Sequence, residues 1–256
     1  MARAWSSGPG VNGSFRGSDA HSLYQDGEER FSPARLEFLP VGITETRIQG
    51  TRLGPRSARA LAELLRMLSC GEESAALAFD RLGGSWHEPA VRSALAGIAA
   101  DERRHQAMLA TLEASLPRPQ HDPPLAAAIR SFFRRLADRD VLVHCARVVA
   151  IDSAVCQILG ALRGRRKPLA ADVRVGAILG RIHHDEARHV AIASDCAAPL
   201  LKSVRGREIA VDARERLTRV LRLRADSLEA LAVDPDRLFA RLRTNPPWRA
   251  IRSDAC

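Results

Sequence analysis

Hydrophobic and polar positions follow a helical period over most of the chain. Apolar residues recur at spacings of three and four, which places them on one face of a helix. This pattern predicts long helices over residues 57–82, 89–115, 125–162 (broken near 137–140) and 170–200, and one or two further helices over 206–243, broken at Asp234-Pro235. With an aromatic content of only 4%, the core must be built mainly from Ala, Leu, Ile and Val, which favours an all-α protein.

Residues that favour helix ends and turns group these helices into two hairpins. Ser57 is a candidate N-cap of the first helix, and Gly83-Gly84 is expected to end it. Four prolines (Pro117, Pro119, Pro123 and Pro124) indicate a long crossover between the hairpins. We therefore expect a four-helix bundle with one long connection at 57–205, preceded by a flexible leader and arm at 1–56, strand-like over 36–50, and followed by a C-terminal helical extension and loose tail at 206–256.

The motif D-E-x-R-H occurs twice in the chain. Asp101–His105 forms one copy and Asp185–His189 the other, each within a predicted helix. Glu at i and His at i+3 project from one helix face, so each copy offers a carboxylate and an imidazole to one point. A single E-x-x-H is a common solvated helix pattern, but two copies in matched positions favour a shared site.

Each copy has a matching acid on the preceding helix of its hairpin. Glu72 lies 30 residues before Glu102, and Asp152 lies 34 residues before Glu186. Both acids fall on the apolar stripes of their helices, and antiparallel packing brings each to the height of its partner. The chain therefore holds a duplicated unit that supplies four carboxylates and two imidazoles to one bundle interior.

This residue set predicts a site for two metal ions, because hard Fe or Mn ions prefer oxygen donors with a few imidazoles. Glu102 and Glu186 are the expected bridges, with Glu72 and Asp152 as terminal ligands and one imidazole, from His105 or His189, for each ion. Asp101 and Asp185 are placed to accept from the imidazole N–H groups, with Arg104 and Arg188 pairing to them in turn. His183 is either an additional ligand or, as we favour, a supporting or surface histidine. Two Fe ions are expected, with Mn or a mixed Fe/Mn pair as the alternative.

The chain resembles the ferritin-like di-iron carboxylate superfamily over about residues 57–200. The resemblance rests on Glu72–Phe79, Asp101–His105, Ile151–Ala154 and Asp185–His189, and points to bacterial stand-alone ferritin-like domain proteins, near rubrerythrins and arylamine oxygenases. It implies metal-ligand roles for Glu72, Glu102, His105, Glu186 and His189. The chain departs from the family at Asp152, where Glu is usual, so the second ion could shift, gain a water or bind weakly.

The expected function is a non-haem di-iron oxidoreductase that activates O2 or peroxide, uses an electron donor and oxidises a small molecule. Small residues near the site (Ala75, Ala76, Ala99 and Ser153) leave room for a cavity, which the C-terminal helices could roof. Iron storage with peroxide detoxification, a tRNA-modifying hydroxylase and a vestigial site are the alternatives. The sequence singles out no catalytic residue beyond the metal ligands.

Composition constrains the partners. The net charge of +9 comes almost entirely from Arg interleaved with acids, which favours solvated helix faces over a nucleic-acid partner. Five cysteines without a C-x-x-C pair, no signal-peptide pattern and no apolar run of about 18 residues indicate a cytoplasmic protein without a membrane segment. A homodimer remains open.

Overall fold

A computed structural model describes residues 51–119 and 122–244 of the chain. All of the described residues belong to one compact unit, which begins at Ile48. The expected strand-like arm at 36–50, nearly all of the leader and most of the tail lie outside the described residues. The part that is described is all-helical and contains no strand.

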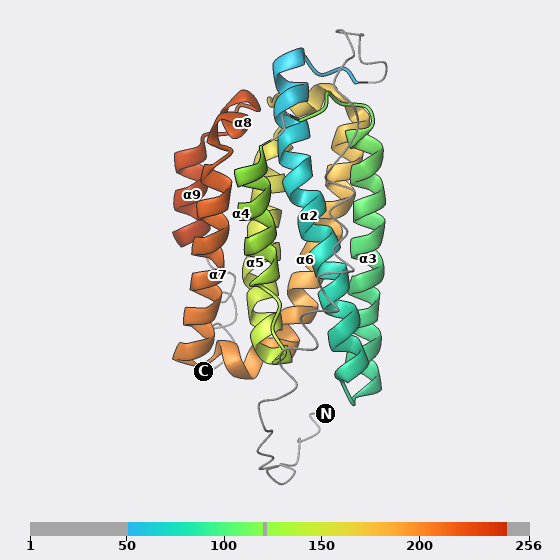
Figure 1. Cartoon of the computed structure of the whole chain (residues 1–256), viewed down its shortest axis with the longest axis vertical. Helices are drawn as coiled ribbons and strands as arrows, with labels where there is room; N and C mark the ends of the chain where they lie inside the picture. Colours follow the sequence, from blue (N-terminus) through green and yellow to red (C-terminus); the bar gives the residue numbers. More distant parts are fainter. Residues whose placement is uncertain (1–50, 120–121, 245–256) are drawn as a thin grey trace. The chain divides into compact units, whose positions relative to one another are not determined.

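Eight α-helices and one short 3-10 helix make up this region (Figure 1). In chain order they are α2 (Pro55–Ser85), α3 (Pro89–Glu113), α4 (Pro123–Arg134), α5 (Val141–Leu162), η2 (Pro168–Ala171), α6 (Val173–Leu201), α7 (Val204–Arg222), α8 (Ala225–Ala230) and α9 (Pro235–Thr244).

Side-chain caps fix where several helices begin. Asp122 accepts a hydrogen bond from the Leu125 N–H at the start of α4, and Asp140 accepts from the first turn of α5. Asp172 caps α6 and also accepts from Thr51 and from the backbone N–H of Arg52, which ties the segment before α2 to the start of α6. These caps satisfy backbone N–H groups that have no partner within the helix.

The four longest helices, α2, α3, α5 and α6, carry the predicted acids and histidines, and they pack as two hairpins. Helix α2 runs along α3, and α5 runs along α6; α3 also contacts α6, which joins the hairpins. Leucine and alanine dominate the shared interior, as the low aromatic content predicted.

The remaining helices cover this core. Helix α4 packs on α2 and α7, while α7 lies along α5 and α6, and α9 packs against α5 and α7. Buried Arg214 of α7 fixes this arrangement by donating to the carbonyls of Ala150 and Leu242 and to the Ser153 hydroxyl. The C-terminal extension is therefore an integral layer of the helical unit.

Several predicted boundaries differ from the observed ones. Gly54, followed by Pro55, precedes the first helix, so Ser57 is not its N-cap. Gly83 and Gly84 lie inside α2, which continues to Ser85 and ends where Trp86 becomes extended. The described part of the extension, up to Thr244, holds three helices instead of one or two, because the turn at 223–224 separates α7 from the short α8.

Helix α5 is the one helix in the described ranges that is long and apolar enough to cross a membrane by length and composition alone. This corrects the expectation that no apolar stretch approaches that length. Its most apolar stretch is 61% buried inside the protein. The central helix of a helical core has the same composition, because it faces neighbours on most sides.

Candidate metal centre

The six predicted ligands meet in the interior of the two hairpins, contributed by four helices. Their donor atoms form two overlapping groups, each with all atoms within 4.8 Å of one another and each able to hold a metal ion. One group is Glu72, Glu102, His105 and Glu186, and the other is Glu102, Asp152, Glu186 and His189. Glu102 and Glu186 belong to both groups, which is the position that the sequence suggested for bridging carboxylates.

The first group is organised around Nδ1 of His105. This nitrogen lies 3.1 Å from Glu72 Oε2, 3.4 Å from Glu186 Oε1 and 3.5 Å from Glu102 Oε2. Helix α3 brings His105 and Glu102 together through their i, i+3 spacing, and α2 and α6 supply the other two acids. One imidazole nitrogen is thus surrounded by three carboxylates.

The second group has fewer internal contacts. Nδ1 of His189 lies 3.2 Å from Glu102 Oε1 and 3.9 Å from Glu186 Oε2, without hydrogen-bond geometry to either. Oδ2 of Asp152 is inaccessible to solvent and has no hydrogen-bond partner within the described residues. Orphaned buried donor and acceptor atoms that face each other are typical of a site built for a cation.

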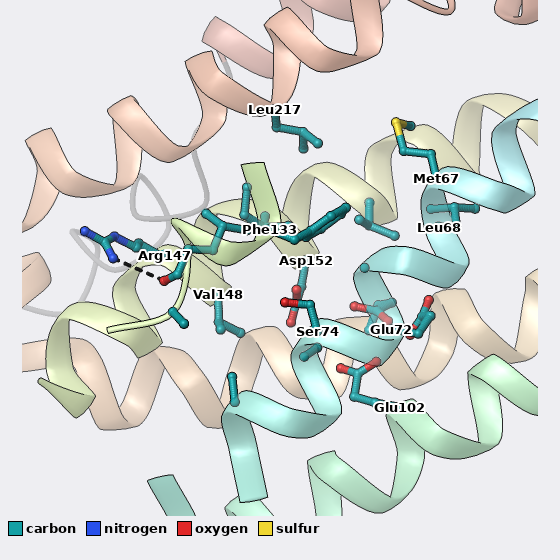
Figure 2. Close-up of a pocket in the computed structure, with 18 of the residues that line it drawn as sticks. Met67, Leu68, Glu72, Ser74, Glu102, Phe133, Arg147, Val148, Asp152 and Leu217 are labelled. Carbon is teal, nitrogen blue, oxygen red and sulfur yellow. Dashed lines mark hydrogen bonds between the residues drawn. The ribbon is translucent and has the colours of Figure 1, made fainter. Parts of the chain in front are cut away.

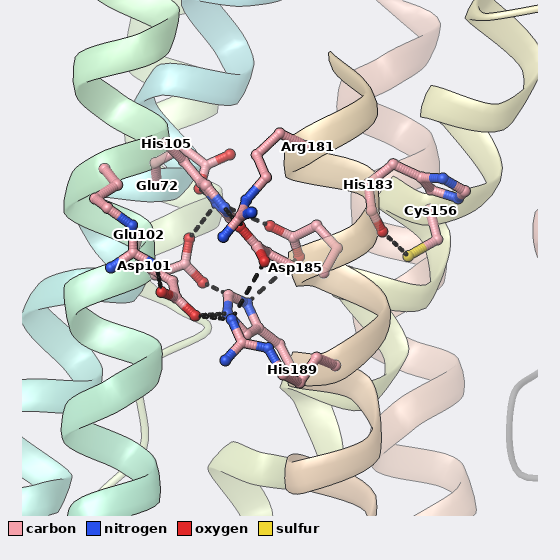
Figure 3. Close-up of polar contacts among 12 residues, drawn as sticks. Glu72, Asp101, Glu102, His105, Cys156, Arg181, His183, Asp185 and His189 are labelled. Carbon is pink, nitrogen blue, oxygen red and sulfur yellow. Dashed lines mark hydrogen bonds and ion pairs between the residues drawn. The ribbon is translucent and has the colours of Figure 1, made fainter. Parts of the chain in front are cut away.

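Each imidazole is held by an aspartate from the opposite hairpin (Figure 3). Nε2 of His105 lies 3.3 Å from Oδ2 of Asp185, and Nε2 of His189 lies 3.2 Å from Oδ2 of Asp101. A carboxylate at Nε2 keeps the proton on that nitrogen and leaves Nδ1 free to act as a metal ligand. The two D-E-x-R-H copies therefore support each other across the α3–α6 contact.

Arginines outside the cluster neutralise these aspartates. Arg104 and Arg188 both pair with Asp101, and Arg188 also reaches Asp185 at 3.3 Å. Arg181 donates to Asp185 at 2.9 Å, a contact that the sequence analysis missed although its i, i+4 spacing could have revealed it.

Because the cluster is buried, its carboxylates are costly to keep ionised without a cation. Both imidazoles are fully buried, and Glu72, Glu102 and Glu186 are almost completely so. Among the described residues, no Lys or Arg forms an ion pair with any of the four ligand acids. Four clustered carboxylates that lack a cationic partner would be costly to keep ionised, and divalent cations would offset that cost. The residues present therefore fit a metal centre.

Burial and close contacts also shift the pKa values of the cluster residues. Burial raises the pKa of Glu72 well above its usual value, and it raises the pKa of Asp152 in the same way. Burial also acts to raise the pKa of Glu102, but hydrogen bonds with Glu72 and His105 and the proximity of the His189 imidazole outweigh it and lower the pKa to about 2. For His105, burial acts to lower the pKa, yet hydrogen bonds to three glutamates raise it to about 12. Protons therefore occupy the cluster where a cation would replace them.

His183 lies outside both groups. Its ring Nδ1 is 3.1 Å from the Arg163 guanidinium, and its backbone carbonyl lies 3.9 Å from the Cys156 thiol (Figure 3). Proximity to Arg163 and partial burial lower its pKa, with burial the larger cause. His183 is therefore a half-buried residue beside Arg163 and belongs to neither ligand group.

A cavity of about 80 Å³ reaches the cluster from the side of α4 and α7 (Figure 2). Glu72, Glu102, Asp152 and Glu186 line its inner end, and its other walls are mostly apolar. Ala75 lines it as expected from the sequence, whereas Ala76 and Ala99 are packed in the core and Ser153 bonds to Arg214. A route therefore leads from the apolar interior to the ligand acids.

Comparisons with protein-family models, with curated proteins and with solved structures found no match to this chain. The part of the chain that the structure describes is all-helical and contains a buried Glu/Asp/His cluster that could hold a metal ion.

Proposed function

We propose that this chain is a ferritin-like dinuclear metal oxidoreductase that uses O2 or peroxide to oxidise a small molecule. The observation that carries the proposal is the pair of ligand groups that share Glu102 and Glu186 beside an apolar cavity. Ligand sets of this kind, drawn from four helices, are the usual construction of di-iron and di-manganese carboxylate sites.

The helix arrangement supports the ferritin-like part of the proposal. Helices α2 and α3 form one hairpin and α5 and α6 the other, joined by a long connection that includes α4. In this proposal the four helices are the bundle and α4, α7, α8 and α9 are additions around it. The crossover between hairpins is the feature that distinguishes a ferritin-like bundle from a simple up-down bundle.

The donor set favours iron or manganese. Four carboxylates and two imidazoles form an oxygen-rich set without a thiolate, which suits these metals better than Cu(I) or a structural Zn ion. When bound, a pair of iron ions would supply the redox and Lewis-acid chemistry that O2 or peroxide activation needs.

The protein's own residues would bind the metal ions, orient the ligand imidazoles and exclude water from the site. Asp101 and Asp185 hold the imidazoles with Nδ1 toward the carboxylates, and the buried position of the cluster keeps bulk water away from it. The apolar cavity would hold an organic substrate against the acids at its inner end.

Oxygen consumption by the iron-loaded chain with a chemical reductant tests this proposal. Glu102→Ala removes a carboxylate shared by both groups, so we expect the rate to fall roughly 100-fold or more, to the level of free iron. Glu208→Ala removes an exposed acid on α7 and serves as the control. Equal rates for wild type and Glu102→Ala would exclude the cluster as the reaction site.

Storage of iron is the competing function, and assembly separates the two. A storage protein needs a large cage and takes up many ions per chain, whereas the proposed enzyme is a small assembly with two. A large cage on size exclusion, filled with iron, would overturn the proposed oxidoreductase.

A further inference from the structure

The cavity beside the metal centre has a second polar end. Asp152 lines its inner end, and His144 lines it eight residues earlier on α5. Eight helical residues correspond to a rise of about 12 Å, so these side chains stand roughly two turns apart along the same wall. The cavity thus extends along α5 from the ligand acids to a histidine that the metal centre does not use.

His144 is buried and lacks a satisfied hydrogen bond. It is 4% exposed, and neither ring nitrogen has a hydrogen-bond partner of normal geometry within the described residues. Phe79 packs on it edge to face, with ring centroids 5.6 Å apart. A buried imidazole normally has a hydrogen-bond partner, and a polar group of a molecule in the cavity that His144 lines would supply one.

The ligand that His144 can accept is uncharged. Burial lowers the pKa of His144 to about 4, against an opposing effect of the Leu136 carbonyl, so the ring is neutral near pH 7. A neutral imidazole offers one donor and one acceptor, which suits a hydroxyl or a carbonyl group.

Among the described residues that line the cavity, none offers an unpaired Lys or Arg that would favour an anionic ligand. Arg147 also lines the cavity, but its guanidinium lies 3.0 Å from Asp138 Oδ2 and donates to the Leu136 carbonyl at 3.1 Å (Figure 2). With its charge already paired, Arg147 gives a carboxylate little advantage, and the cluster acids at the other end would repel it.

The remaining walls favour a small aliphatic molecule. They include Leu68, Phe133, Val148, Val155 and Leu217, contributed by α2, α4, α5 and α7. The volume of about 80 Å³ is roughly half that of an engineered 150 Å³ cavity known to bind benzene. A few carbon atoms with one polar group would fill it.

We propose that this cavity is the substrate site, that it takes a small uncharged aliphatic molecule with one hydroxyl or carbonyl group, and that His144 positions this molecule by hydrogen-bonding that group. The opposite, apolar end of the molecule then lies against Glu72 and Asp152, where oxidation would occur. The role as a substrate site rests on the proposed oxidoreductase function; the selectivity of the cavity does not.

Binding of three probes of similar length tests the assignment: 1-butanol, 1-chlorobutane and butanoate. Their dissociation constants are measured by NMR titration of the full-length, metal-free chain. Wild type should bind 1-butanol and 1-chlorobutane, and it should bind butanoate at least about 10-fold more weakly than 1-butanol.

His144→Phe should weaken 1-butanol by about 2- to 10-fold, the worth of one neutral hydrogen bond, and leave 1-chlorobutane within about 2-fold. His144→Gln, which keeps a donor and an acceptor, should bind 1-butanol within about 2-fold of wild type. His87→Phe changes an exposed histidine in the turn before α3 and should alter neither probe. Ala75→Leu, which fills part of the cavity, should weaken both.

The contrary outcomes are equally distinct. Loss of both probes to the same extent in His144→Phe would show a packing role and overturn the assignment of His144. Absence of binding to wild type, or unchanged binding in Ala75→Leu, would overturn the cavity as a ligand site. Preferred binding of butanoate would overturn the uncharged class.

Iron content, measured separately on the same preparations, keeps the two proposals apart. A chain that binds the probes as expected but takes up no iron would retain the selective cavity and lose the oxidoreductase function. A chain that binds iron but shows none of the probe differences would retain the metal centre and lose the role of His144.

Discussion

Two aspartates decide which imidazole nitrogen faces the carboxylates of the cluster. Asp185 holds Nε2 of His105, and Asp101 holds Nε2 of His189. Because each aspartate is itself paired with arginines, its charge is stable where it lies. Hydrogen bonding to His105 and Arg181 outweighs burial and lowers the pKa of Asp185.

Asp185→Asn should weaken metal binding without removing a ligand. The amide cannot hold the His105 Nε2–H as firmly as a carboxylate does, so we expect iron affinity to fall about 10- to 100-fold. Competition with a chelator of known affinity measures the change. Asp212→Asn, which alters a half-buried acid on α7 that pairs with Arg216 outside the cluster, is the control and should leave affinity unchanged. Equal affinity in both variants would remove the orienting role of Asp185.

His144 should make the folded protein sensitive to mild acid. Its pKa is about 4 in the folded state, where burial and the charge of Arg147 lower it, and the Leu136 carbonyl and Asp138 act the other way. The ordinary value is about 6.5, so between these values the unfolded chain binds more protons and falling pH favours unfolding. Relative to His144→Gln, wild type should lose stability progressively below pH 6.5, up to about 3 kcal/mol near pH 4.

Denaturant unfolding of the metal-free chain at a series of pH values measures this difference. Titration of the cluster acids contributes equally to both proteins and cancels in the comparison. Parallel pH profiles for wild type and His144→Gln would contradict a buried, neutral His144.

At the scale of elements, the turn between α6 and α7 leaves no room for a side chain. A Cβ at Gly206 would lie 2.0 Å from the Leu200 carbonyl oxygen, which is backbone and cannot move aside easily. The backbone N–H of Gly206 also donates to the Ser203 hydroxyl, which caps the start of α7. The join of the C-terminal layer to the second hairpin therefore depends on this glycine.

Gly206→Ala should lower the free energy of unfolding by about 3 kcal/mol, because the turn must shift to relieve the contact. Gly176→Ala, on α6 with no neighbouring atom within 4 Å of the added Cβ, should instead raise it by about 0.5–1 kcal/mol. Denaturant titration of both variants gives the comparison. Similar small effects in the two variants would show that the α6–α7 turn is loosely packed.

The sequence predicted the helices well and their ends less well. Apolar periodicity identified the long helices because burial of one face determines it. It misplaced the end of α2, since Gly83 and Gly84 stay helical when packing on α3 continues past them. It also missed that Asp101 and Asp185 each reach across to the other copy, because this depends on how α3 and α6 cross.

The cavity shows a further limit of sequence reasoning. Small residues near the ligands suggested a space, yet three of the four named are occupied elsewhere in the packing. The actual walls come from helices distant in sequence, including α4 and α7, so only the fold could reveal them. His144 belongs to no recognisable sequence motif. Only its buried position in the fold, without a hydrogen-bond partner of normal geometry, marks it as a candidate binding residue.

At the scale of the whole molecule, the duplicated hairpin gives a centre that is unequal in its two halves. The Glu72 half surrounds an imidazole nitrogen with three glutamates, whereas the Asp152 half uses a shorter acid whose Oδ2 has no partner among the described residues. We expect the first half to bind its ion more tightly than the second. Binding in two steps of different affinity would follow.

Anaerobic titration with Fe(II), followed by measurement of bound iron per chain, tests the metal centre most directly. We predict two ions per wild-type chain, the second weaker than the first, and none above background when Glu102 and Glu186 are both changed to Ala. Asp152→Ala should retain one ion. A wild-type chain that binds neither Fe(II) nor Mn(II), or a double variant that binds as much iron as wild type, would contradict a metal centre built on these residues.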